Sequence, residues 1–224
     1  TIAQLHGMTE AEVTALNGTK TNKISAGQEW KVFDRPTASD LKGFASRSWL
    51  EGLLDSNRVS SMQYFGATKF TDGKMARFVK RDVAKFAAAD QDKLRKVLQA
   101  VSAEAALPVQ RDADQRDATA IAEGKRLMAS EEMRCTECHR FHNQDDDATA
   151  PDLTGYGSRS WLVDFINDPA HKRFYGERND RMPAFGKAQI LDPLSIGLLA
   201  DWLRGDWYEP SPEQRSQRTE ASVQ

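Results

Sequence analysis

Apolar residues recur at helical spacing in three segments of the chain. They are Trp161, Leu162, Phe165 and Ile166 in one, Leu94, Val97, Leu98 and Val101 in another, and Ile196, Leu199 and Leu203 in the third, where Trp202 lies beside the stripe. Spacings of three and four residues place such side chains on one face of a helix. Pro169 ends the helix of residues 160–168, while Asp192 and Pro193 begin the last helix and Gly205 ends it. Residues 117–207 show no convincing strand alternation, so we expect an all-α domain there.

Two segments 112 residues apart are nearly identical. Residues 40–50 and 152–162 agree at eight of eleven positions, and the differences are Lys42/Thr154, Phe44/Tyr156 and Ala45/Gly157. The apolar face recurs as Trp49, Leu50, Leu53 and Leu54, and residues 64–66 and 73–78 resemble residues 174–176 and the loop that contains Met182. We interpret this as an internal duplication. The first copy spans residues 37–106, the second spans 117–207, and the polar segment 107–116 with Pro108 is predicted to be a linker.

The chain has two cysteines, and both lie in Cys135-Thr136-Glu137-Cys138-His139. C-x-x-C-H is the attachment signature of c-type haem, in which both thiols form thioethers with the haem vinyl groups and the histidine binds the iron. Two alternatives are open. A redox-active C-x-x-C requires a strand-to-helix context in a βαβ fold, and a structural zinc site requires four Cys or His ligands. The flanks show no parallel-sheet pattern and no second C-x-x-C exists, so the motif predicts one covalent haem.

A haem iron bound by His139 needs a sixth ligand or stays open for chemistry. Met182 is the candidate, 43 positions after His139, because a thioether is a soft ligand that favours reduced iron. Pro183 stiffens the loop that carries it. His171 is the rival ligand, whereas we predict that His142 and His6 are surface histidines.

The order of motifs from residue 117 to residue 207 resembles a class I cytochrome c: helix, C-x-x-C-H, P-x-L-x-G at residues 151–155, helix, M-P-x-F, helix. The resemblance implies that the Pro151 carbonyl accepts a hydrogen bond from His139. It also implies that Gly124, in a first helix of residues 118–130, packs against the Trp202 region where first and last helices cross. Tyr156, Arg159 and Trp161 are candidates to reach the haem propionates, with packing and surface charge as their alternative roles. Residues 158–162 and 173–176 further resemble cytochrome domains fused or bound to bacterial cytochrome bc-type complexes.

The first copy lacks the haem motif. The repeat offset places that position at residues 23–27, whose sequence is Lys-Ile-Ser-Ala-Gly, so we expect one haem per chain and a packing role for Met75. The alternative is that a segment bearing a first haem is missing from this sequence. Residues 1–36 instead resemble most of a LysM module, a small α/β peptidoglycan-binding unit, with Asn17-Gly18 as the turn after its helix. The opening strand of that family is absent, so both a functional LysM and a structural remnant remain open, and only residues 22–27 of its glycan groove carry over.

Composition sets the broad class. The length of 224 residues allows one or two domains, 29% charged residues indicate a water-soluble chain, and a net charge of −2 does not suggest a nucleic-acid-binding polycation. No stretch approaches the roughly 20 apolar residues of a membrane span, and no signal-peptide pattern begins the chain, so Thr1 is interpreted as the start of a mature chain or fragment. Residues 208–224 are predicted to be a disordered tail, and residues 143–147 form an acidic loop that is solvated or orients a basic partner.

Together these observations predict a mainly α electron carrier with one haem c, located in the periplasm or otherwise outside the cytoplasm. We expect it to act as a carrier rather than as an enzyme on its own, and membership of an oxidoreductase complex stays open. Expected partners are redox proteins, in particular a respiratory or photosynthetic membrane complex, with peptidoglycan contact through residues 1–36 as a further possibility. Two alternatives stay open. One is a haem enzyme or gas-binding cytochrome in which Met182 is displaced, and the other is a cell-wall-anchoring scaffold module.

Overall fold

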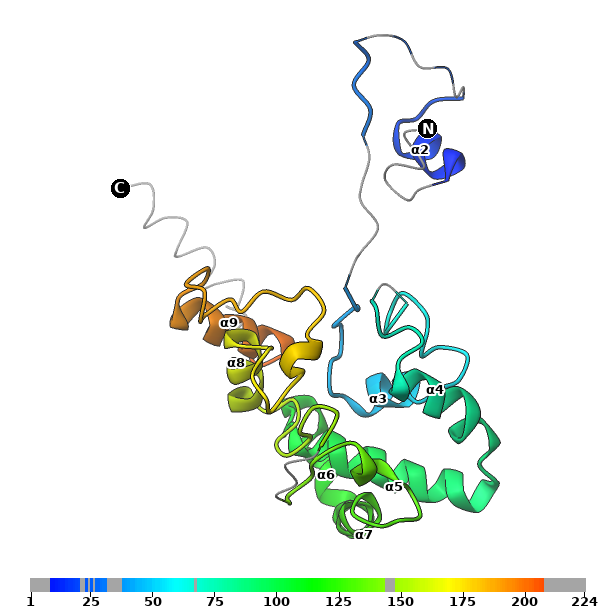
Figure 1. Ribbon diagram of the computed structural model, residues 1–224, viewed down its shortest axis with the longest axis vertical. Coiled ribbons are helices and arrows are strands. Elements are labelled where there is room, and N and C mark those ends of the chain that lie inside the picture. Colours follow the sequence, from blue (N-terminus) through cyan, green and yellow to red (C-terminus); the bar gives the residue numbers. More distant parts are fainter. Residues whose placement is uncertain are drawn as a thin grey trace.

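The structure, a computed structural model, describes residues 9–20, 23, 25, 27–31, 38–66, 68–143 and 148–207. These residues are mainly helical and contain no strand, which confirms the mainly α class (Figure 1). The α-helices are α2 (Glu10–Leu16), α3 (Arg47–Leu53), α4 (Lys74–Arg81), α5 (Ala88–Glu104), α6 (Arg111–Arg116), α7 (Ala118–Met128), α8 (Arg159–Asn167) and α9 (Pro193–Leu203). Short 3-10 turns lie at η1 (Val83–Lys85), η2 (Pro108–Gln110), η3 (Cys135–Glu137) and η4 (Gly176–Arg178). The predicted linker is therefore itself largely helical.

Helix α2 begins at a side-chain capping box and ends at a glycine turn. Thr9 and Glu12 form a reciprocal capping box at the start, and Gly18 turns the chain after the helix with φ of +62°. The Asn17 side chain then bonds both the backbone N–H and the carbonyl of Lys31, at 2.7 Å each. The predicted Asn17-Gly18 turn is confirmed. The described residues of the LysM-like segment contain α2 and no strand, so the α/β character of this segment stays a prediction. His6 lies outside the described residues.

The duplication is visible in matching hydrogen bonds. In each copy a serine caps the helix, and the tryptophan one turn later donates its indole N–H to an aspartate carbonyl nine residues back: Ser46, Trp49 and Asp40 in the first copy, Ser158, Trp161 and Asp152 in the second. The two indole bonds measure 3.2 and 2.9 Å. The two copies therefore share local structure as well as sequence.

The two copies pack on each other at two of the three positions of the repeat at which their sequences differ. Phe44 lies 5.1 Å from Tyr156 between ring centroids, and a Cβ added at Gly157 would lie 2.3 Å from the Cβ of Ala45. The φ of Gly157 is +73°, so both the space and the backbone require glycine there. Buried Arg204 at the end of α9 donates to the carbonyls of Gly157 and Ala105, which ties the second copy to the end of α5.

Helix α7 packs along α5, the last helix of the first copy. A Cβ at Gly124 would lie 1.9 Å from the Lys96 carbonyl oxygen, so the backbones touch at this point. The expected contact between Gly124 and Trp202 is therefore wrong, and the Trp202 side chain is 62% exposed. The short helical connection between α5 and α7 places the two helices side by side (Figure 1). In the sequence, α5 has the same kind of apolar stripe as α9.

Helix α9 packs on α8 instead, through one of its sides. Ile196 and Ala200 are buried there, while Leu194, Leu198 and Trp202 are exposed on the opposite side. None of the helices within the described ranges is long and apolar enough to cross a bilayer. The predicted tail and residues 144–147 of the acidic loop lie outside the description.

Candidate functional site

The C-x-x-C-H motif forms a single tight turn, separated from the end of α7 by residues 129–134. Arg134 enters it with φ of +58°, Cys135 to Glu137 form η3, and the Cys135 carbonyl accepts bonds from the N–H groups of Cys138 (3.3 Å) and His139 (3.0 Å). Both thiols are free. Buried Met133 anchors the start of the turn in the main apolar core, against which Cys135 also packs. The turn is therefore fixed at its first cysteine, and the second cysteine and the histidine follow in set positions.

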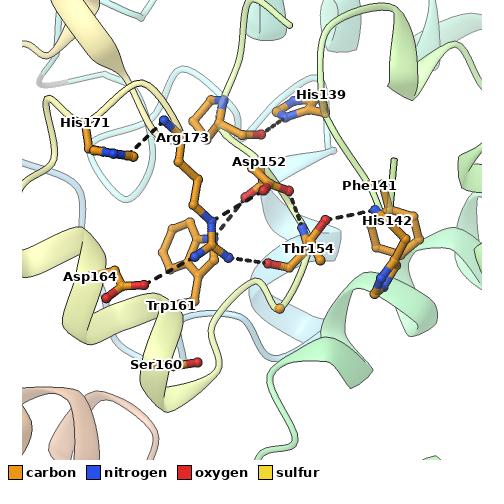
Figure 2. Close-up of polar contacts among 12 residues, drawn as sticks. His139, Phe141, His142, Asp152, Thr154, Ser160, Trp161, Asp164, His171 and Arg173 are labelled. Carbon is orange, nitrogen blue, oxygen red and sulfur yellow. Dashed lines mark hydrogen bonds and ion pairs between the residues drawn. The ribbon is translucent and has the colours of Figure 1, made fainter. Parts of the chain in front are cut away.

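His139 makes the hydrogen bond that the class I resemblance implied. Its Nδ1 lies 2.7 Å from the Pro151 carbonyl oxygen (Figure 2). Because a carbonyl only accepts, Nδ1 is the protonated nitrogen, and Nε2 keeps its lone pair for another partner. Burial lowers the pKa of His139, against the opposing effects of the Pro151 bond and Asp152, and thus favours the neutral imidazole. Neutral imidazole is the form that binds a metal.

Burial raises the pKa of the Cys135 thiol to about 11. A redox-active cysteine is a thiolate at neutral pH, with a lowered pKa and positive charge or a helix N-terminus beside it. Cys135 has the opposite environment. The redox-disulfide alternative therefore fits this turn poorly.

The donor set also bears on the zinc alternative. No three His, Cys, Asp or Glu side chains gather as a site for a metal ion in the part of the chain that the structure describes. Cys135, Cys138 and His139 therefore do not converge on one point. A covalent haem needs no such convergence, since its thioethers form at the ring edge and the imidazole binds the central iron. The spacing of the three side chains therefore does not contradict a covalent haem, which stays a prediction at this point.

The segment of residues 149–155 is hydrogen-bonded to the backbone on both sides of His139. The N–H groups of Thr149 and Ala150 donate to the Cys138 carbonyl at 3.0 Å each, and the N–H of Leu153 donates to the Arg140 carbonyl at 2.9 Å. Arg173 clamps the loop from outside, as Figure 2 shows: it donates to the Thr154 carbonyl at 2.9 Å and pairs with Asp152 and Asp164. The Pro151 carbonyl is therefore held in place by bonds on either side of it.

Glu104, at the end of α5, is a site residue that sequence reasoning missed. Its side chain is 8% exposed and accepts from Lys125 (2.8 Å), His142 (3.0 Å) and the N–H of Gly155 (2.9 Å). Burial alone raises the pKa of Glu104, but these three bonds outweigh it and lower the pKa below its ordinary value. One signal was present in the sequence. Glu104 lies three residues after Val101 and so continues the apolar stripe of α5, where a carboxylate is out of place.

The candidate iron ligands and His142 differ in how exposed they are to solvent. Met182 is half-buried, and its backbone carbonyl accepts from the Asn179 side chain at 2.8 Å. His171 is exposed, and its Nδ1 accepts from the Arg173 N–H. The surface position predicted for His142 is confirmed. The axial roles of Met182 and His171 remain predictions.

The three propionate candidates all contact protein groups. Tyr156 is 7% exposed and packs against Phe44 and Trp161. The Trp161 indole donates to the Asp152 carbonyl, and Arg159 pairs with Asp201 at 2.6 Å. Their packing and ion-pairing roles are therefore directly visible, and contact with propionates remains a prediction.

Comparison of the chain with protein-family models, with curated proteins and with solved structures finds no match. Function is therefore inferred from the residues and their geometry.

Proposed function

We propose that this chain is an extracytoplasmic c-type cytochrome that carries single electrons between redox partners. The observation that supports the proposal most strongly is the hydrogen bond of 2.7 Å between His139 Nδ1 and the Pro151 carbonyl, next to two free thiols on one turn. Cys135 and Cys138 would tether one haem, and His139 would bind its iron through Nε2. A bound haem supplies a centre that takes up and releases one electron.

The protein residues orient and shield this centre. Pro151 fixes the tautomer and ring orientation of His139, which is the usual role of a hydrogen-bond partner behind a metal-bound histidine. Met182 would be the second protein ligand to the iron, on a loop that Pro183 stiffens and that Asn179 holds by its bond to the Met182 carbonyl. Thioether ligation favours reduced iron, so the centre would have a higher potential than one with two nitrogen ligands.

The domain assignment and the partner are proposals as well. Residues 117–207 are proposed to form a class I cytochrome c domain, and residues 37–106 its haem-less copy. The likeness of residues 158–162 and 173–176 to cytochrome domains of bc-type complexes supports a membrane-bound respiratory or photosynthetic complex as the partner. Peptidoglycan contact through residues 1–36 is a separate proposal, tested by retention of that segment on isolated peptidoglycan.

The duplication provides a matched test of the ligand. Met182→Ala is compared with Met75→Ala, which removes the corresponding methionine of the haem-less copy, and with His171→Ala. We expect Met182→Ala alone to abolish the low-spin spectrum of His/Met ligation and to lower the midpoint potential. Loss of that spectrum in Met75→Ala or His171→Ala instead would reassign the ligand. Absence of covalent haem from the wild-type protein would refute the proposed function.

A further inference from the structure

We propose that Glu104 is a positioning residue for His139, supplied to the haem site by the copy that has no haem of its own. The inference rests on the proposed function. It gives the haem-less copy a specific task, which is to hold the loop that orients the proximal histidine.

Glu104 joins three segments that surround the motif turn. Lys125 lies on α7, before the motif, His142 follows the motif, and Gly155 ends the loop that begins at Pro151. All three donate to one carboxylate whose side chain is 8% exposed. The first copy therefore contacts the second both before and after His139.

The contact reaches His139 through short links. His142 donates its backbone N–H to the Thr154 side chain at 2.8 Å, next to Gly155, and Leu153 bonds back to Arg140. The same loop carries Pro151, whose carbonyl accepts from His139. Glu104 thus fixes the loop at Gly155, and at the other end of the same loop Pro151 orients the imidazole of His139.

The location of Glu104 is unfavourable for a carboxylate on general grounds. It lies in the last turn of α5, where the helix dipole disfavours negative charge, and it is nearly buried. Glutamate is stabilised there by three donors, one of them the cationic Lys125. A charged residue at a position that burial and the helix dipole both disfavour is typical of a functional site.

Removal of the negative charge of Glu104 should raise the midpoint potential of the haem, for two reasons. A looser loop weakens the Pro151 bond, which lowers the basicity of His139 as a ligand and so stabilises ferric iron less. Loss of a nearly buried negative charge also stabilises the ferric state less. Both effects raise the midpoint potential.

The test compares Glu104→Gln with Glu123→Gln in the full-length haem-bearing protein. Glu123 also pairs with a lysine across the α5–α7 contact, with Lys96 at 2.9 Å, but no bond joins it to the loop. We expect Glu104→Gln to raise the midpoint potential and to speed amide exchange at Gly155, and Glu123→Gln to change neither. A full complement of covalent haem in both variants shows that they fold.

The possible failures are distinguishable. Wild-type protein without covalent haem contradicts the proposed function. Equal potentials and equal Gly155 exchange for the two variants, in protein that carries haem, contradict only the role of Glu104.

Discussion

The Nδ1 atom of His139 lies 2.7 Å from the carbonyl oxygen of Pro151. The position equivalent to Pro151 in the first copy is Ser39, whose hydroxyl donates to the Tyr64 carbonyl. The two copies therefore share the loop and the helix after it, but within the described residues a histidine bonds to that loop only in the second copy. This difference places the proposed haem chemistry in the second copy and leaves the first as its support.

The contact of α7 with α5 predicts unequal effects of two substitutions. Gly124→Ala should lower the free energy of unfolding by roughly 1–3 kcal/mol, because the new methyl group would meet the Lys96 carbonyl. Trp202→Ala should change it by no more than about 0.5 kcal/mol, since that side chain is largely exposed. Urea denaturation of both variants measures the two values. A larger loss for Trp202→Ala would show that α7 packs on α9 instead.

The matching indole bonds predict equal effects in the two copies. Trp49→Phe and Trp161→Phe each remove a donor to an aspartate carbonyl and should each cost about 1–3 kcal/mol. The second variant should also speed amide exchange in residues 152–155, because its partner Asp152 lies in that loop. Urea denaturation and hydrogen exchange measure both effects. Clearly unequal losses of stability would mean that the repeat is not structurally equivalent at these positions.

Two neighbouring glycines separate backbone strain from steric clash. Both have positive φ, +70° at Gly155 and +73° at Gly157, so alanine at either costs about 1–2 kcal/mol. Alanine at Gly157 would in addition clash with Ala45 of the first copy. We therefore expect Gly157→Ala to be the more destabilising by thermal denaturation. Equal losses would indicate that the two copies do not pack at Ala45.

The ionisation of Glu104 predicts a pH dependence of stability. Its pKa in the folded protein is lowered from the ordinary 4.5, because three hydrogen bonds outweigh burial. The carboxylate therefore stabilises the fold above its unfolded pKa, and this contribution is lost as the pH falls through the folded value. The stability difference between wild type and Glu104→Gln should be largest near neutral pH and shrink below about pH 4.5. Unfolding at a series of pH values, with Glu123→Gln as control, measures it, and a constant difference would contradict the assignment.

Local features of the chain could be predicted from the sequence because their causes are local. The last helix begins at Asp192 as expected, with the Asp192 side chain accepting from the Ser195 N–H at 2.8 Å. The helix after Ser158 follows from its apolar spacing and its cap. The bond between His139 and Pro151 joins residues close in sequence, and the resemblance to class I cytochrome c implied it.

Contacts between segments far apart in the sequence could not be predicted in the same way. Helices α5 and α9 offer similar apolar stripes, so the sequence does not say which one receives α7 at Gly124. Glu104 was missed for a related reason: its three donors come from segments that only the folded chain brings together. Both cases depend on how one copy packs on the other.

The central claim, a covalent haem on Cys135 and Cys138, is tested most directly by a pyridine haemochrome assay. The protein is purified, extracted with acidic organic solvent to remove any haem that is not covalently bound, and compared with the Cys135→Ser/Cys138→Ser double variant. We predict one haem per wild-type chain that survives extraction and none in the variant. No retained haem in the wild type, or two per chain, would contradict this account.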